Sequence, residues 1–441
     1  MPRSKDEVLK LIDDNNIKYI RLWFTDILGC LKGMSITRSE IEPVLDHGQG
    51  FDGSSIEGFV RIEESDLMAI PDLDTFTIIP WEVNSEKIAT LFCDIQNPDG
   101  SPYEGDSRYI LKRVLSDIAR DGYKAYFGPE IEYFYFKDSS STQIIDRGGY
   151  FDYATADEPT RIRKKTTSAL ESIGVQVECS HHEVAESQHE IDLKYQRALK
   201  MADHTMIYRL VVKEIAATEG YYATFMPKPI FGSNGSGMHV HQSLFKENKN
   251  VFFDDNDQYN LSDIARNYIA GLLKHIKEFC LVTNQWVNSY KRLVPGYEAP
   301  VYISWGRRNR SSLVRVPMYR LGREEATRIE LRSPDPACNP YLAFAVMLAA
   351  GYEGIKNDYP LCNPIEENIF DLDEKKLRRQ KIKTLPNSLE NAVHEFKKSK
   401  LMKKVLGDHL FEKLIDNKMV EWDRYRMAVT QYEIDNYLPI L

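Results

Sequence analysis

The sequence predicts an α+β protein of two domains, and three features of the chain lead to this prediction. Its 441 residues exceed the usual size of a single domain. The pattern from residue 17 to about 100 is mostly strand-like, with apolar runs bounded by turn residues. Beyond residue 105 the long segments repeat apolar residues at helical spacing, and short strand-like pieces separate them.

The N-terminal region is expected to contain several strands. "IKYIRLWFTDILGCLKGMSI" predicts two strands around residues 26–29, and "IATLFCDIQ" predicts another. Between them lies "DHGQGFDGSSIEGFVRIEESD", whose four glycines and polar residues predict a long loop. A long loop in a compact domain is often functional.

The stretch "NPDGSPYEGDS" is the expected domain boundary, which gives domains at 1–105 and 106–441. Asp106 is predicted to cap a helix whose apolar residues follow the i, i+3, i+4, i+7 rule until residues 121–122. Further helices are predicted at 158–173, 194–218, 262–281 and 339–356, and from 387 onward. The sequence shows no internal repeat and no low-complexity segment.

Composition excludes several classes of protein. With 57 basic and 66 acidic residues the net charge is −9, which argues against a nucleic-acid partner. No apolar run reaches membrane-spanning length, and "MPRSKDEVLK" has no hydrophobic signal region, so a cytoplasmic protein without a membrane partner is expected. The six scattered cysteines form no CxxC pair and predict reduced thiols rather than a zinc site or a disulfide framework.

Carboxylates alternate with apolar residues in "FGPEIEYFYF", where Glu130 and Glu132 would share one face of a strand. Burying this pair without a positive partner would be costly. Four other segments also carry charged or imidazole side chains in positions that predict a shared face or turn. They are "HHEVAESQHEID" with Glu183 and Glu190, "MHVHQSL" with His239 and His241, "RIELR" with Arg328, Glu330 and Arg332, and "KRLVPGYEAP" with Lys291, Arg292 and Glu298.

Taken singly, each segment has an ordinary explanation: a solvated strand face for "RIELR", a core histidine for His239, or a salt-bridged edge for Glu130. Together they predict a cavity lined by carboxylates and an imidazole, which would repel one another unless divalent cations were bound. This oxygen-rich set suits Mg²⁺ or Mn²⁺ better than Zn²⁺ or copper. The nearby arginines favour phosphate or carboxylate ligands. Neither a P-loop nor a G-x-G-x-x-G fingerprint is present.

The chain resembles the type I glutamine synthetases over nearly its whole length. The resemblance lies in "FDGSSIEGF", "KPIFGSNGSGMHVHQSL", "NSYKRLVPGYEAP", "RNRS" and "RIELRSPDPACNPYLAFA", in that order. It implies a glutamate–ammonia ligase that uses ATP and passes through γ-glutamyl phosphate. It also implies a small β-grasp-like N-terminal domain and a larger domain with a curved antiparallel sheet and helices. Two stacked six-membered rings would form a homododecamer, in which a neighbour's N-terminal loop completes each active site.

The resemblance further implies two or more Mg²⁺ or Mn²⁺ ions in each active site, with ATP as co-substrate. Glu132, Glu183 and Glu190 would hold the cation nearer glutamate. Glu130, His239 and Glu330 would hold the cation that bridges the ATP phosphates. The implied ATP contacts are Glu178, His241, Ser243, Arg310, Arg315 and Arg328, of which Arg310 is best placed for the transferring group.

The acceptor end of the site follows from the same resemblance. Glutamate would be bound by Glu132, Asn234, Gly235, Arg292, Glu298 and Arg332. Asp52 would take a proton from ammonium, aided by Asp66, although composition alone allows both to be loop caps. Glu298 would lie on a flap that excludes water from the acyl phosphate.

Two positions bear on regulation. Where one branch of the family has an adenylylated tyrosine in N-L-Y-D-L, this chain reads "NIFDL", so Phe370 offers no hydroxyl for that modification. The short chain resembles the alpha-like branch of Gram-positive bacteria and archaea. In that branch an arginine matched here by Arg61 takes part in feedback by glutamine. A nitrogen-regulatory protein or 2-oxoglutarate could also control the enzyme.

Two other functions are compatible with parts of this pattern. A ligase on the same scaffold could add γ-glutamyl groups to a polyamine or another amine; the presence of Asp52, Asp66 and Glu298 together favours ammonium. A non-catalytic descendant would be expected to have lost ligands, and none is missing from the sequence.

Overall fold

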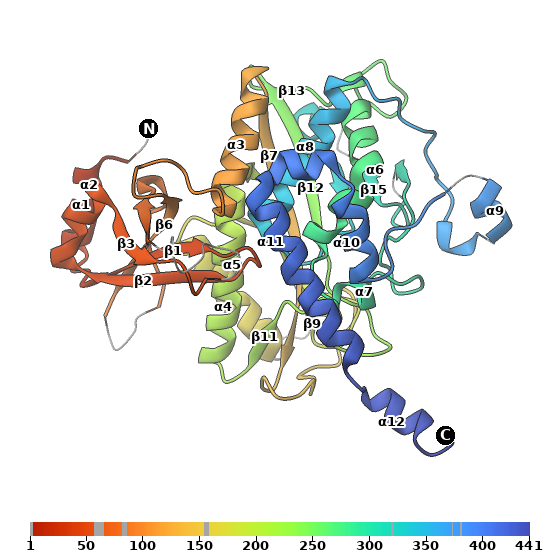
Figure 1. The fold of residues 1–441 in the computed structure, drawn as a ribbon, viewed down its shortest axis with the longest axis horizontal. Helices are drawn as coiled ribbons and strands as arrows, with labels where there is room; N and C mark the ends of the chain where they lie inside the picture. The colour runs from red at the N-terminus through yellow and green to blue at the C-terminus, as the bar shows by residue number, and fades with distance from the viewer. Residues whose placement is uncertain are drawn as a thin grey trace.

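The computed structural model describes residues 3–56, 66–81, 86–153, 158–307, 309–318, 322–372, 374–379 and 382–441. Figure 1 shows the N-terminal part, in red and orange, as a separate body beside a larger body that contains most of the helices. Each body has its own sheet, one of six strands and one of ten among the described residues. The α+β class predicted from the sequence is confirmed.

The N-terminal sheet has the strand order β2-β1-β6-β4-β3, with β5 paired to β6. Its strands are β1 (Tyr19–Thr25), β2 (Leu31–Thr37), β3 (Gln49–Asp52), β4 (Asp66–Pro71), β5 (Thr77–Ile78) and β6 (Ile88–Gln96). β1 pairs antiparallel with β2 and parallel with β6. The hairpin and the strand predicted from the sequence are therefore present.

Two helices accompany this sheet, α1 (Lys5–Asp14) and α2 (Ile41–His47). Ser4 caps α1 through a capping box with Glu7, which satisfies N–H groups that the first turn leaves free. Val8 and Ile12, four residues apart, lie on one helix face and are fully buried in the N-terminal core.

The glycine-rich stretch before β4 is not a loop throughout, which corrects the sequence-based expectation. Residues 49–52 form β3, which pairs antiparallel with β4 and places Asp52 opposite Asp66. β3 is the edge strand of its sheet, where polar residues and glycines are tolerated because one side needs no partner strand. Residues 57–65 of this stretch, including Arg61, lie outside the described residues.

The large sheet has the order β14-β15-β16-β12-β7-β9-β8, with β10 and β11 on β7 and β13 on β12. All pairs are antiparallel except β14 with β15. Its strands are β7 (Lys124–Phe136), β8 (Val177–His182), β9 (Gln188–Leu193), β10 (Gln196–Arg197), β11 (Tyr222–Thr224), β12 (Met238–Lys246), β13 (Lys249–Asn250), β14 (Trp305–Arg307), β15 (Val314–Val316) and β16 (Ile329–Leu331).

Strand β12 separates an apolar from a polar face, as its sequence predicts. Met238, Val240 and Leu244 are buried in the main core. His239 and His241, on the opposite face, are only partly buried. Because side chains alternate along a strand, this register turns the imidazoles away from the helices that cover the sheet and toward the site.

The helices of the larger body mostly follow the predicted segments. They are α3 (Ser107–Arg120), α4 (Glu158–Ser172), α5 (Ala198–Thr218), α6 (Asp263–Thr283), α7 (Ser289–Arg292), α8 (Pro340–Lys356), α9 (Glu374–Arg379), α10 (Leu389–Lys397), α11 (Lys400–Met427) and α12 (Gln431–Tyr437). Short 3₁₀ turns lie at Arg38–Glu40, Leu73–Thr75, Glu324–Ala326 and Ile369–Asp371. Asp106 caps α3 as predicted, by accepting the N–H of Arg108. α5 begins later than predicted because residues 196–197 pair with β7.

The C-terminal end stands apart from the body. In Figure 1, α11 lies against the larger body, and α12 projects beyond the C-terminal end of α11. Tyr432, Leu438 and Ile440 in this region are exposed. Within the part of the chain that the structure describes, no helix has both the length and the apolarity needed to cross a membrane, and all six cysteines are unpaired, as predicted.

Candidate active site

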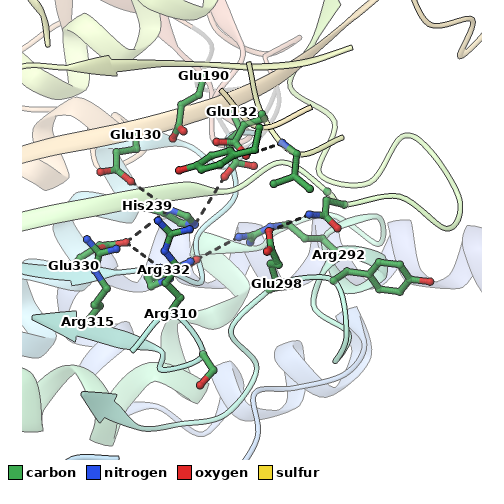
Figure 2. Close-up of a pocket in the computed structure, with 18 of the residues that line it drawn as sticks. Glu130, Glu132, Glu190, His239, Arg292, Glu298, Arg310, Arg315, Glu330 and Arg332 are labelled. Carbon is green, nitrogen blue, oxygen red and sulfur yellow. Dashed lines mark hydrogen bonds and ion pairs between the residues drawn. The ribbon is translucent and has the colours of Figure 1, made fainter. Parts of the chain in front are cut away.

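A cavity of about 490 Å³ lies on the polar face of the large sheet. Figure 2 shows carboxylates, an imidazole and arginines pointing into it from different elements. The lining residues that the sequence analysis selected are Glu130, Glu132, Glu183, Glu190, Asn234, Gly235, His239, Arg292, Glu298, Arg310, Arg315, Glu330 and Arg332. One space thus receives thirteen side chains or backbone positions that come from residues 130 to 332.

Glu130, His239 and Glu330 form the first cluster, called here the histidine group. Nδ1 of His239 lies 3.3 Å from Oε2 of Glu130 and 3.7 Å from Oε1 of Glu330. One potential ligand atom from each residue lies within 4.8 Å of the others. This is the set of three residues expected to hold the second cation.

Strand register explains why these three residues meet. His239 of β12 is paired with Glu130 of β7, and β16 brings Glu330 along the other side of β12, opposite His241. On the next strand, Arg315 is paired with Glu330. Neighbouring strands thus align residues that are distant in sequence on one sheet face.

Cations surround the histidine group. Nε of Arg315 lies 2.8 Å from Oε2 of Glu330, and Nη1 of Arg332 lies 3.6 Å from Oε1. Burial opposes ionisation of Glu130, but the neighbouring histidines outweigh it and hold the pKa of this carboxyl well below its usual range. Burial, with the charge of Arg332, lowers the pKa of His239, which favours the neutral imidazole that can bind a cation.

Glu132, Glu183 and Glu190 form the second cluster, called here the carboxylate group. Oε2 of Glu132 accepts hydrogen bonds from the N–H of Gly237 at 2.8 Å and from Nε2 of Gln188 at 2.9 Å. Glu183 and Glu190 approach His181, at 3.6 Å and 3.1 Å from its two ring nitrogens. His181, Glu183 and Glu190 each offer a potential ligand atom within 4.8 Å of the others. Glu132 is not part of this set, although it lines the same cavity.

The carboxylate group contains uncompensated negative charge. Burial and then the Glu183 carboxylate raise the pKa of Glu132 to about 8. Burial and several acidic neighbours, Asp192 first, raise the pKa of Glu190 well above its usual range. Burial and the Glu130 carboxylate raise the pKa of Asp192 to about 8. Without cations, Glu132 and Asp192 therefore hold protons at neutral pH.

Buried oxygens without hydrogen-bond partners provide a test of whether cations fit. Oε1 of Glu190 is buried and makes no hydrogen bond among the described residues. Both carboxylate oxygens of Glu330 are also buried, and although they form ion pairs with Arg315 and Arg332, neither contact is aligned as a hydrogen bond. Unsatisfied buried oxygens are unfavourable, and hard divalent cations prefer such ligands. The donor set of both clusters therefore fits Mg²⁺ or Mn²⁺.

Four arginines line one side of the cavity, on the side where Glu330 lies (Figure 2). Nη1 of Arg292 donates to the carbonyls of Ser333 at 2.7 Å and Pro334 at 3.2 Å, which fixes the guanidinium beside the cavity. The guanidinium of Arg310 lies 5.9 Å from the ring centre of Tyr150, another lining residue. Such fixed cations suit phosphate and carboxylate groups.

The residues expected to contact glutamate lie together on this side of the cavity. Nδ2 of Asn234 donates to Oε2 of Glu298 at 3.1 Å. Glu298 has a positive φ of 59°, an uncommon conformation for a side chain of this kind that often marks functional positions. At Gly235 an added Cβ would lie 2.3 Å from the Pro227 carbonyl oxygen, so only glycine fits there.

The expected ATP contacts are divided. Arg310 and Arg315 line the cavity. Nε2 of His241 donates to Glu130 at 2.6 Å, and Nε of Arg328 donates to Nδ1 of His241 at 3.2 Å. These hydrogen bonds connect Arg328 through His241 to the histidine group. Ser243 follows on the same strand face, whereas Glu178 lies on β8, and neither is part of the cavity lining.

Asp52 and Asp66 lie in the N-terminal sheet, opposite each other on β3 and β4, and do not line this cavity. A single chain therefore does not bring them to the metal-binding candidates. Phe370, selected for a different reason, does line the cavity.

Several lining residues were missed by the sequence analysis. Gln188 shares its strand face with Glu190, so the same alternation could have identified it. Tyr150, Asn309, Ser311 and Asn368 come from irregular segments, and no periodic signal in the sequence marks them. His181 was overlooked although it is the first residue of the quoted "HHEVAESQHEID" motif.

Comparisons with known proteins agree with this geometry. Residues 16–98 match the family "Glutamine synthetase, beta-Grasp domain", and residues 104–437 match "Glutamine synthetase, catalytic domain". A glutamine synthetase of Clostridium saccharobutylicum is 50% identical over 99% of this chain and 98% of its own.

Two solved structures have the same fold over nearly all of the chain. The Plasmodium falciparum glutamine synthetase has a TM-score of 0.89 at 26% identity, covering 99% of each chain. A structure described as a GmaS/ADP complex has a TM-score of 0.88 at 28% identity, covering 98% of this chain and 99% of that chain. The β-grasp N-terminal domain implied by the resemblance is confirmed, and the chain belongs to the glutamine synthetase family of ligases.

Proposed function

We propose that the protein joins ammonia to L-glutamate at the expense of ATP, through γ-glutamyl phosphate, giving glutamine, ADP and phosphate. The observation that carries this proposal is the single cavity in which two clusters of cation ligands lie together with four arginines. A carboxylate is a poor acyl donor until one of its oxygens becomes a good leaving group. A site for a triphosphate beside a site for an amino acid supplies that conversion.

In the first step the γ-carboxylate oxygen of glutamate attacks the γ-phosphorus of ATP, and the bond to the ADP oxygen breaks. Arg292 and Asn234 bind the amino-acid end, and Arg332 lies beside the reacting carboxylate. Arg310 and Arg315 contact the phosphates, where their fixed charges offset the charge that spreads over the transferring group. The histidine and carboxylate groups would hold divalent cations, whose positive charge would reduce the repulsion between the phosphates and glutamate.

In the second step ammonia attacks the acyl carbon and phosphate leaves. Ammonium must first lose a proton, because it has no lone pair. We assign this proton to Asp52, aided by Asp66, of a neighbouring chain, since neither residue lines the cavity of its own chain. Glu298, beside Asn234, excludes water that would hydrolyse the acyl phosphate.

The test is phosphate release from ATP and Mg²⁺ with glutamate, comparing ammonium with methylamine and putrescine. The expected result is release that requires both glutamate and ammonium, with glutamine as the product. Arg310→Ala should abolish most of this activity, whereas Arg323→Ala, at an exposed arginine paired with Glu325, should not change it. Turnover with an amine but not with ammonium would favour the γ-glutamyl-amine ligase instead.

The assembly proposed for this site is a homododecamer of two stacked hexamers. Support comes from the separation of Asp52 and Asp66 from the cavity. Inactive Asp52→Asn and Arg310→Ala proteins, dissociated and reassembled together, should regain roughly one quarter of the wild-type activity, because mixed neighbours then form intact sites. No recovery, with mixed assemblies shown by mass spectrometry, would place both residues in one chain's site.

Regulation is proposed through feedback by glutamine at Arg61, in the manner of the alpha-like branch, rather than through adenylylation, because Phe370 has no hydroxyl. Arg61→Ala should then raise the glutamine concentration that half-inhibits the enzyme. Inhibition as strong as that of the parent would contradict this assignment. We propose Mg²⁺ or Mn²⁺ as the cations, which competitive titration of the two would rank.

A further inference from the structure

One partly buried carboxylate holds the hairpin that carries the carboxylate group. Asp146, in the segment between β7 and α4, accepts a hydrogen bond from Nε2 of His182 at 2.6 Å through Oδ1. Its other oxygen accepts from Nε2 of His189 at 3.1 Å. His182 of β8 and His189 of β9 are a cross-strand pair, so Asp146 bridges the two strands.

The same segment also fixes the turn of the hairpin. The N–H of Ser187 donates to Oδ1 of Asp146 at 3.1 Å, and the hydroxyl of Ser187 accepts from the N–H of Ile145 at 2.7 Å. Ser187 has a φ of +61°, which a serine adopts only when its surroundings hold it there. The turn that separates Glu183 from Glu190 therefore depends on residues 145–146.

Each bridged histidine directly precedes a carboxylate of the cavity, Glu183 or Glu190. Nδ1 of His182 donates to the carbonyl of Glu183 at 2.6 Å. Nη1 of Arg163 donates to Nδ1 of His189 at 2.7 Å, which leaves Nε2–H to face Asp146. Neighbouring residues on a strand point to opposite faces of the sheet. The bridge therefore contacts the hairpin on the face away from the cavity, while Glu190 projects into the cavity.

Asp146, His182 and His189 are close enough to resemble a further cation site. Their facing atoms are already paired with one another, and the Arg163 guanidinium occupies the remaining nitrogen of His189. A cation there would have to displace these hydrogen bonds and lie close to a positive charge. The cluster is better suited to holding the hairpin than to binding a metal ion.

We propose that Asp146 is a positioning residue that sets the separation of the Glu183 and Glu190 carboxylates, and thereby the cation affinity of the carboxylate group. This inference rests on the proposed function, because it takes these carboxylates as cation ligands. Asp146 does not contact substrate; it acts through His182 and His189.

Gly148 offers a second way to disturb the same bridge. An added Cβ at this residue would lie 2.7 Å from Nε2 of His182. Gly148→Ala should therefore displace the imidazole without removing any carboxylate. A suitable control is Asp138→Asn in the same segment, because Asp138 is exposed and accepts hydrogen bonds from Ser140 and Ser141, away from the bridge.

The experiment titrates the full-length assembled protein with Mn²⁺ and measures free Mn²⁺ by electron paramagnetic resonance. Asp146→Ala should weaken one class of site by about 10–100-fold and leave the class assigned to the histidine group within about threefold. Asp146→Asn should fall between, because its single carbonyl oxygen can accept from His182 but its amide cannot accept from His189. Gly148→Ala should resemble Asp146→Ala, and Asp138→Asn should resemble the wild type.

Kinetics supply a readout that a general loss of structure would not give. For Asp146→Ala the KM for Mg²⁺ should rise by about the same factor, while kcat at saturating Mg²⁺ stays within about threefold of wild type. Unchanged Mn²⁺ affinities, or equal weakening of both classes with a lower Tm, would overturn the role of Asp146. If wild-type protein bound no divalent cation, the proposed function itself would fail, and the variants would not be needed to show it.

Discussion

The two clusters line the same cavity, but the charges around their carboxylates differ. In the histidine group, Arg315 and Arg332 approach Glu330, and His239 and His241 hydrogen-bond to Glu130. In the carboxylate group, Glu132 and Glu190 face further carboxylates, and the pKa of each is raised, for Glu132 to about 8. Protein cations compensate one cluster, whereas the other depends on protons or bound metal.

This difference teaches how a site can be both stable and responsive. The histidine group has protein partners for both of its carboxylates without a ligand, so its geometry is set before substrate arrives. The carboxylate group would release protons on binding the proposed cation, which would couple binding to pH. Experiments that remove one charge at a time should therefore have opposite effects on the two clusters.

The largest effect is expected from Glu330→Ala. It removes a candidate ligand and leaves Arg315 and Arg332 without the carboxylate they approach, so ammonium-dependent phosphate release should fall by about 100–1000-fold. Glu325→Ala, at an exposed glutamate paired with Arg323, is the control and should retain activity. Near-normal activity of Glu330→Ala would refute the assignment of the histidine group.

The next effect is the pH dependence of cation affinity. Because burial raises the pKa of Glu132 to about 8, a cation must displace a proton below that pH, so affinity should rise by up to about tenfold per unit between pH 6.5 and 8. Calorimetry in buffers of different ionisation enthalpy should detect proton release. Glu132→Gln should flatten the profile; an unchanged slope in that variant would assign the protons to other groups.

The raised pKa of Glu132 also predicts how the stability of the fold changes with pH. A carboxyl whose folded pKa is raised stabilises the fold at low pH, and this contribution is lost as pH rises through about 8. Without cations, this carboxyl should therefore lower Tm as pH rises from about 4.5 to about 8, and Mg²⁺ should raise Tm more at pH 9 than at pH 6.5. Equal Mg²⁺ effects at both pH values would contradict this account.

A smaller expected effect is a difference in the sign of the Tm change between variants of the two clusters. Glu190→Gln removes an ionisable carboxyl from a repulsive set and should raise the cation-free Tm at pH 8.5 by roughly 2–4 °C. Glu330→Gln removes the carboxylate that Arg315 and Arg332 approach and should lower the Tm by a similar amount. Shifts of the same sign in differential scanning calorimetry would remove the distinction between the clusters.

The smallest effect is expected at Asp192, whose pKa is raised to about 8 by burial and Glu130 although Asp192 does not line the cavity. Asp192→Asn should change kcat by less than about threefold and shift the midpoint of the pH profile slightly downward, because one acidic neighbour is removed. A large loss of kcat would show that this side chain takes part in the reaction.

Much of this site could be predicted from alternation along single strands. In β12 the apolar positions are buried and His239 and His241 lie on the other face, as the sequence indicates. In β7, Tyr133 and Tyr135 enter the main core, whereas Glu130 and Glu132 line the cavity. Helix starts such as Asp106 were also predictable, because a cap acts on its own first turn.

What could not be predicted depends on contacts between distant segments. The glycine-rich sequence of β3 suggested a loop, because nothing in the sequence shows that β4 lies beside it. β3 forms by pairing with the edge of β4. The bridge from Asp146 to His182 and His189 joins residues 36 and 43 positions apart, and periodicity cannot reveal it. The sequence analysis also did not predict the direct proximity of His181 to Glu183 and Glu190.

The sequence by itself determined which side chains are polar, which strand face each occupies and, through its motifs, the family of the chain. Only the tertiary structure decided which charges became neighbours and therefore which carboxylates are paired and which hold protons. The physical reason is that alternation is a local property of the backbone, whereas a pKa depends on burial and on charges brought close by strands from across the chain.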